Sequence, residues 1–298
     1  MAQSEQTDGL HARELLQQSR RESLGLLSLA IPALCIIFFI IVIPVGWLFY
    51  LSFIGDEGQF TLEHYTKMIE YKSYYRVFLN TFKVSILTTL ICLLLGYPLA
   101  YFLSQLPARW AGLFMLTVLL PFWTSLLVRT YAWLVLLQRK GLLNQFAIDI
   151  GLWDTPVKLV HNLTGTLIGM AHIMLPFLVL PLYNAMRKID RDLMHAASNL
   201  GTTPGKAFWQ VYFPMSLPGM IAGTLIVFVL CLGFYVTPAV LGGGRVAMVA
   251  TQITSILENQ FNWGAASSLG VVLLIATLLV LYLVGRVFRL DDALFGRR

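Results

Sequence analysis

The chain contains six apolar runs, and each of them is long enough to cross a lipid bilayer as a helix. A spanning helix needs about 20 residues, and lipid cannot satisfy free backbone groups, so every run is expected to be helical. Only 12% of the 298 residues are charged, about half of the share usual in a soluble protein. We therefore predict an all-α, polytopic membrane protein. The runs lie at approximately 25–53, 79–103, 111–137, 163–183, 219–241 and 268–289.

These runs divide the chain into three parts. Residues 1–24 form a polar N-terminal segment, residues 25–289 form the transmembrane domain, and residues 290–298 form a C-terminal tail. The polar start is too long, and the first apolar run too long, for a cleaved signal peptide, so we expect an uncleaved anchor. Six spans place both termini on the same side of the membrane.

Lysine and arginine are distributed unequally between the two sides. The flanks that include both termini and the 184–218 segment carry twelve of these residues, and the opposite flanks carry seven. The remaining two, Lys83 and Arg129, lie inside apolar runs. Since basic residues favour the cytoplasmic side, both termini and the 184–218 segment are expected in the cytoplasm. The net charge of +6 then reflects topology, and no nucleic-acid partner is predicted because no continuous basic stripe occurs.

The 184–218 segment is predicted to fold into two short helices. Asp190 or Asp192 is suited to cap the first helix, and Gly201 is suited to the left-handed residue that ends it. A long ordered loop is usually functional, so we interpret this segment as a docking element. The alternative is a pair of amphipathic helices on the membrane surface, which would normally carry more Lys and Arg.

The second helix of this segment is expected to start with Thr203 as a cap and Pro204 in its first turn. Pro214 is expected to end it. The letters GTTPGKA do not form a phosphate-binding loop, because such a loop needs four residues between its glycines and a Ser or Thr after the Lys. Here three residues separate Gly201 from Gly205, and Ala207 follows the Lys. ATP is therefore expected on a partner and not on this chain.

The segment that begins HAASNLGTTPGKAFWQ resembles the EAA signature of permease subunits of binding-protein-dependent ABC importers. In that signature, E-A-A is followed by a Gly, a Phe-centred second helix and a Pro-x-x-x-Pro-Gly ending; Pro218 and Gly219 match this ending, and His195 replaces the leading Glu. The resemblance implies coupling helices that seat in a cleft of a partner ATPase, which binds ATP and Mg. The implied ATPase-coupling residues are His195, Ala196, Ala197, Gly201, Lys206, Phe208 and Pro214.

Three other stretches are similar to the spermidine/putrescine permease family: residues 120–145, 174–190 and 234–244. This resemblance implies a type I ABC importer permease (MetI-like) fold in a bacterial inner membrane. It also implies a second homologous permease, an ATPase dimer and a periplasmic substrate-binding protein. A polyamine is the implied solute, although related permeases for other amines, opines and 4-aminobutyrate share much of this sequence pattern.

The apolar runs contain no Asp or Glu. A charged side chain in mid-bilayer costs about 3 kcal/mol or more, so carboxylates found there are usually functional. Their absence predicts a weak passage made of aromatic faces and backbone carbonyls, with selectivity mainly in the binding protein. The same aromatic residues also fit helix packing or an interfacial belt. The candidate pathway and gate residues are Trp123, Arg129, Tyr131, Trp133, Tyr235 and Pro238.

Three of the residues inside the apolar runs have more specific interpretations. Arg129 is interpreted as a gate contact or an anion site, near enough to the external end of a straight span to snorkel outward. His172 is interpreted as an interhelical hydrogen-bond partner and not as a ligand. Pro238 is expected to break its span and to act as the hinge of an external gate.

Two other function classes fit the sequence less well. An ion-coupled carrier would ordinarily place carboxylates in mid-membrane, and none occurs in the apolar runs. An intramembrane enzyme needs a nucleophile with a base, or a metal cluster. No H-E-x-x-H motif occurs, and we predict neither catalytic residues nor a metal site.

Overall fold

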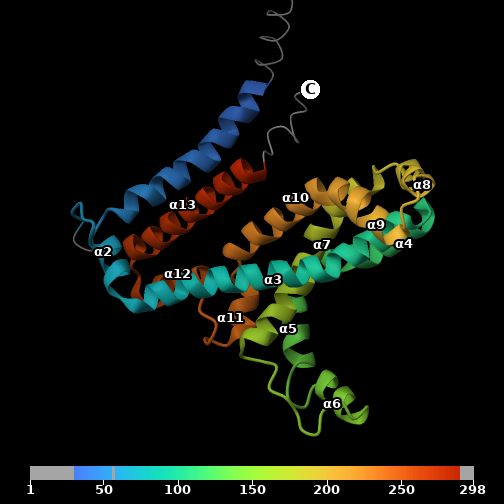
Figure 1. The fold of residues 1–298 in the computed structure, drawn as a ribbon. Helices are drawn as coiled ribbons and strands as arrows, with labels where there is room; N and C mark the ends of the chain where they lie inside the picture. Colours follow the sequence, from blue (N-terminus) through green and yellow to red (C-terminus); the bar gives the residue numbers. More distant parts are fainter. Residues whose placement is uncertain (1–29, 56–57, 289–298) are drawn as a thin grey trace, which may run out of the picture.

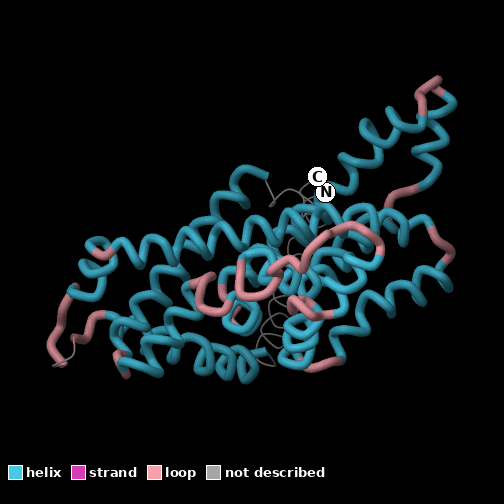
Figure 2. The backbone as a smooth tube through the Cα atoms, turned by 90° about the horizontal axis from the view of Figure 1, so that it is seen from below, coloured by secondary structure: helices cyan, strands magenta, loops and turns pink. Residues whose placement is uncertain are grey.

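The computed structural model describes residues 30–55 and 58–288, and almost all of its regular structure is helical (Figure 1). Figure 2 shows that loops are confined to the connections between helices. The segments predicted at 1–24 and 290–298 lie largely or wholly outside the described residues. Five described helices are long and apolar enough to cross a membrane, and a bent pair makes a sixth span. The five are Ala30–Ser52, α3 (Lys72–Gln105), α7 (Leu163–Arg187), Pro204–Leu232 and α13 (Trp263–Phe288).

The third predicted span is not straight. It consists of α4 (Ala108–Leu119) with the 3₁₀ turn Leu120–Trp123, followed by α5 (Leu126–Leu136), and the two arms meet at 96°. At the bend, the N–H and the hydroxyl of Thr124 both donate to the carbonyl of Pro121, at 3.1 and 2.7 Å. These bonds close the turn and satisfy the freed carbonyl, so the helix ends inside the span. The single helix predicted for 111–137 is therefore wrong.

The fifth predicted span is displaced towards the start of the chain. One continuous helix of 29 residues, Pro204–Leu232, contains α9 (Pro204–Ala207), the π-helical turn Phe208–Tyr212 and α10 (Phe213–Leu232). Pro214 does not end this helix, because it lies where the ladder changes from π to α spacing and its missing N–H is tolerated there.

The break in this region follows α10. Gly233 and Tyr235 flank it, and the short helix α11 (Val236–Gly242) begins immediately afterwards. Pro238 lies inside α11 near its start, where a proline removes no hydrogen bond of the ladder. The predicted break at Pro238 is therefore wrong.

The core is formed by α3, α7 and α10, which pack on one another. Gly219 allows α10 to approach α7 closely, because a Cβ at this position would lie 2.3 Å from the Cβ of Ala185. The centre of the core contains only apolar side chains and small polar ones. Its fully buried apolar residues include Cys92, Met170, Met174, Leu178, Val227 and Cys231.

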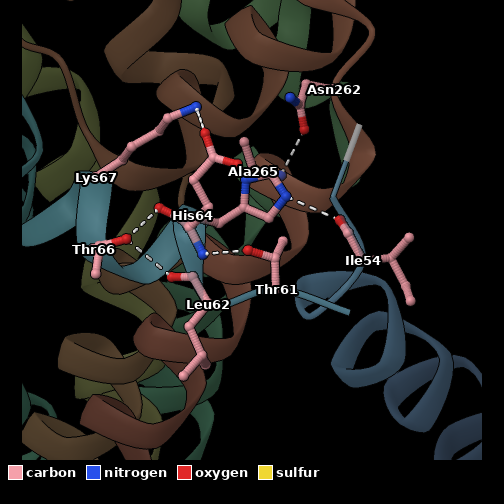
Figure 3. Close-up of polar contacts among 9 residues, drawn as sticks. Ile54, Thr61, Leu62, His64, Thr66, Lys67, Asn262 and Ala265 are labelled. Carbon is pink, nitrogen blue, oxygen red and sulfur yellow. Dashed lines mark hydrogen bonds and ion pairs between the residues drawn. The ribbon is translucent and has the colours of Figure 1, made fainter. Parts of the chain in front are cut away.

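The end of the molecule opposite α8 (Arg191–Asn199) is closed by α2 (Glu63–Glu70), α12 (Val249–Gln260) and the start of α13 (Figure 1). His64 is only 4% exposed there, and its Nε2 donates to the carbonyl of Ile54 at 2.9 Å (Figure 3). The side chain of Asn262 accepts the N–H of Ala265 at 2.8 Å and caps α13. His64 thus ties the chain that leaves the N-terminal helix to α2. The remaining helix, α6 (Leu142–Asp149), lies in the connection between α5 and α7.

Candidate functional site

The first half of the predicted coupling segment is α8. Asp190 caps it, because its Oδ1 accepts the N–H of Asp192 at 3.0 Å. The helix ends at Asn199, and Gly201 follows with a φ of +81° and donates its N–H to the carbonyl of Ser198 at 2.9 Å. Only glycine adopts this left-handed conformation without strain. The predicted cap and the predicted glycine end are both confirmed.

The second half of the segment is α9 with the π-helical turn. Thr203 precedes α9 but forms no side-chain cap bond, so its predicted capping role is wrong. Pro204 does occupy the first turn, as predicted. Because α9 continues into α10 without a break, the second half of the segment is the N-terminal extension of a core helix and not a separate short helix.

Phe208 is the centre of an aromatic cluster that fixes this segment to α3. Its ring lies edge-on to Tyr97 and Tyr101, at centroid distances of 6.4 and 5.5 Å, and stacks on Tyr212 at 5.7 Å. Aromatic pairs of this geometry contribute about 0.5–1.5 kcal/mol each beyond their buried area. The hydroxyl of Tyr212 also hydrogen-bonds to Ser104 at 2.9 Å. Phe208 is therefore an internal anchor of the segment and not part of its outer surface.

The outer surface of the segment contains large apolar side chains that the sequence reasoning did not select. Leu200 is 86% exposed and Trp209 is 64% exposed, although both lie in an otherwise polar region. Such an exposed group of apolar residues marks a contact surface. The signal available in the sequence was a Trp next to the anchoring Phe208. Of the predicted coupling residues, Ala197 is buried, and the exposed ones are His195, Ala196, Gly201, Lys206 and Pro214.

A polar hollow of about 750 Å³ lies between α8 and the ends of α3 and α7. His195 lines it together with Arg187 and Lys188. The guanidinium of Arg187 donates to the carbonyl of Leu106 at 3.1 Å, which joins the end of α7 to the connection between α3 and α4. His195 thus lines a hollow that contains the acidic Asp190 as well as basic side chains.

Two of the predicted pathway residues, Arg129 and Trp133, form contacts from α5 to other parts of the chain. Trp133 donates its Nε1–H to Nδ1 of His172 on α7 at 3.1 Å, so the prediction of an interhelical bond for His172 is confirmed. Arg129 places its guanidinium carbon 5.9 Å from the centre of the Phe122 ring. Arg129 lies in the first turn of α5, immediately after the bend, and not towards the end of a straight span.

The other predicted pathway residues are dispersed over the molecule. Trp123, 87% exposed, lies at the bend beside an apolar hollow of about 470 Å³. Tyr131 is exposed on α5, and Tyr235 is exposed in the break before α11. Pro238 is buried within α11. Arg129 and Trp133 therefore lie one turn apart on α5, and the remaining four candidates are spread over the bend, α5, the break before α11 and α11 itself.

The chain is similar to known transport proteins over most of its length. The family described as Binding-protein-dependent transport system inner membrane component matches residues 94–290. The spermidine/putrescine transport system permease protein PotB of Haemophilus influenzae is 35% identical over 252 residues, which are 82% of this chain and 88% of that protein. PotB of Escherichia coli (strain K12) is 33% identical over 261 residues, or 81% and 94% of the two chains.

Solved structures show the same fold. A chain of a bacterial alginate ABC transporter, in complex with an alginate pentasaccharide-bound periplasmic protein, superposes with a TM-score of 0.71. The superposition covers 87% of this chain and 93% of that one, at 17% sequence identity. The predicted all-α fold of an ABC importer permease is thereby confirmed.

Proposed function

Since this chain belongs to the binding-protein-dependent transport system inner membrane components, we propose that it is the permease subunit of an ATP-driven polyamine importer. It passes spermidine or putrescine from a periplasmic binding protein through the bacterial inner membrane. The observation that carries the proposal is the similarity to spermidine/putrescine permeases across four fifths of the chain. A permease of this family is a transport component and not an enzyme.

We further propose that a second, homologous permease completes the passage and that an ATPase dimer binds ATP and Mg for both. Both termini and α8 face the cytoplasm, as the excess of Lys and Arg on that side supports. The exposed Leu200 and Trp209 are the apolar contacts through which the segment 184–218 docks on the ATPase.

The helix Pro204–Leu232 supplies the mechanical link in this proposal. Its 29 residues correspond to about 43 Å at the helical rise of 1.5 Å per residue. One end lies in the docking segment, and the rest packs on α3 and α7. Because no flexible joint separates the two ends, a movement of the ATPase at α8 and α9 is transmitted directly to the core helices.

The solute is tested by purifying the complex with its binding protein and identifying the ligand that co-purifies. We expect spermidine or putrescine, and ATP-dependent uptake of the labelled compound by proteoliposomes. Recovery of an opine or 4-aminobutyrate would contradict the proposed polyamine substrate but would still agree with an ABC importer. Uptake that continues without ATP while a proton gradient is held would contradict the importer itself.

The coupling segment is tested with Gly201→Asp. A non-glycine residue is strained at a φ of +81°, so the chain reversal after α8 should be lost, and ATP-coupled uptake with it, while membrane insertion is unchanged. Gly205→Asp is the matched control, because it introduces the same charge at a position with open space and no positive φ. Unchanged uptake by the Gly201 variant would count against the coupling role.

A further inference from the structure

Arg129 carries a positive charge for which the described part of the chain shows no ion pair. Its Nε and Nη1 atoms are shielded from solvent, and neither forms a hydrogen bond with any residue that the structure describes. The contact with the Phe122 ring, at 5.9 Å from the centroid, is at the outer limit of a cation–π interaction. Two shielded guanidinium nitrogens without acceptors are costly, so an acceptor from another molecule is expected here.

The membrane spans of this chain offer no acid. None of the six apolar runs contains an Asp or a Glu. Arg129 acts electrostatically on His172, and Nδ1 of His172 already accepts the indole N–H of Trp133. A histidine carries no negative charge in either protonation state. The described part of the chain therefore supplies no acceptor for Nε and Nη1, which leaves a neighbouring molecule as the source to test.

The surface next to Arg129 is apolar and uncovered. On α5, Leu127 is 53% exposed, Val128 is 63% exposed and Tyr131 is 54% exposed. At the bend, Trp123 is 87% exposed. This face lies on α5, the second arm of the bent helix pair, and is left open by the described part of the chain.

We propose that Arg129 pairs with a carboxylate of the second permease subunit, which packs on the α5 face formed by Leu127, Val128 and Tyr131. The proposal rests on the two-permease assembly proposed above. Charge complementarity selects a carboxylate, since two shielded donors need an anionic acceptor. A polycationic solute is repelled by the guanidinium and does not supply that acceptor.

The test measures how much of the tagged second permease co-purifies with this chain in mild detergent, without solute or binding protein. Arg129→Gln should reduce the recovered partner by about tenfold or more, because one member of a buried ion pair is left alone. Lys83→Gln is the matched control: Lys83 is a basic residue within the α3 span but is exposed, and it should change recovery by less than about twofold. Arg129→Lys keeps the charge and should retain more partner than Arg129→Gln.

A double-mutant cycle identifies the acid. Each Asp or Glu in the spans of the second permease is changed to Asn or Gln, alone and together with Arg129→Gln. At the position of the paired acid, the double variant is expected to lose no more association than either single variant, because each single change already breaks the same ion pair. Wild-type association of Arg129→Gln, or additive losses at every acidic position, would overturn the proposal and assign Arg129 to a lipid phosphate, an anionic solute or a packing role. Because association is measured without solute, failure to transport polyamine does not affect this result.

Discussion

Trp133 donates its indole N–H to Nδ1 of His172 at 3.1 Å, and this bond joins the second arm of the bent span to a helix of the core. Since Nδ1 is the acceptor, the ring proton of the neutral imidazole lies on Nε2. The remaining contacts of α5 with the core include α11, where the hydroxyls of Thr130 and Thr237 lie 3.4 Å apart. Few bonds therefore hold the bent arm in place.

Trp133→Phe should loosen this arm without emptying its site. A smaller aromatic ring remains at position 133, but the hydrogen bond to His172 is lost, at a cost of about 0.6–1 kcal/mol in a membrane protein. We expect a lower melting temperature of the purified complex in detergent. Tyr131→Phe is the control, because it removes a polar group from an exposed position of the same helix. Equal melting temperatures of the Trp133 variant and the wild type would show that the bond does not stabilise the bend.

Phe208→Ala should separate ATP hydrolysis from transport. Removing the ring deletes its contacts with Tyr97, Tyr101 and Tyr212, and so disconnects the docking segment from α3. Phe208 is partly buried, so loss of its ring should cost less than the roughly 3–5 kcal/mol of a fully buried Phe. We expect uptake in proteoliposomes to fall by about tenfold or more at a nearly unchanged rate of ATP hydrolysis.

Trp209→Ala distinguishes anchoring from docking. Trp209 is 64% exposed, and its ring also lies 5.4 Å from that of Phe208 and 4.9 Å from that of Phe213. Its loss should therefore weaken association with the ATPase and lower the melting temperature of this subunit less than Phe208→Ala does. Co-purification of the ATPase measures the effect. The same uncoupled phenotype in both variants, hydrolysis without uptake, would argue against separate roles for the two side chains.

Gly219→Ala should force α10 away from α7. The added Cβ would lie 2.3 Å from the Cβ of Ala185 and 3.1 Å from the carbonyl oxygen of Pro181. Overpacking of this kind costs about 1–3 kcal/mol, and thermal unfolding in detergent measures it. Gly270→Ala, in the interior of α13 with no atom within 4 Å of the new Cβ, should be neutral or slightly stabilising. A clear loss of stability in Gly270→Ala would contradict the interpretation that Gly219→Ala acts through a steric clash with α7.

His64→Leu should destabilise the end of the molecule formed by α2 and α12. The variant leaves the carbonyl of Ile54 without the donor that now lies 2.9 Å away, and an unsatisfied buried group costs about 1–3 kcal/mol. His64→Gln keeps a donor and should lose less. Faster hydrogen exchange at residues 50–70 in the Leu variant would support this role. Identical hydrogen exchange at these residues in the Leu variant and the wild type would contradict this role.

Much of the structure of the 184–218 segment was predictable because the sequence signals for helix ends are local. The cap at Asp190 and the positive φ at Gly201 depend on neighbours within a few residues. The roles of Pro214 and Pro238 were not predictable from the same rules. A proline ends a helix only if the freed backbone groups find no other arrangement, and at Pro214 a π-helical turn supplies one.

The order and approximate length of the membrane spans follow from the amino-acid sequence alone, because the cost of placing polar groups in lipid applies to each residue wherever it packs. The right-angled bend after Trp123, the meeting of Trp133 with His172 and the isolation of Arg129 were decided only by the tertiary structure. Each of these depends on which helices become neighbours, and residues about 40 positions apart in the chain carry no local signal of their contact.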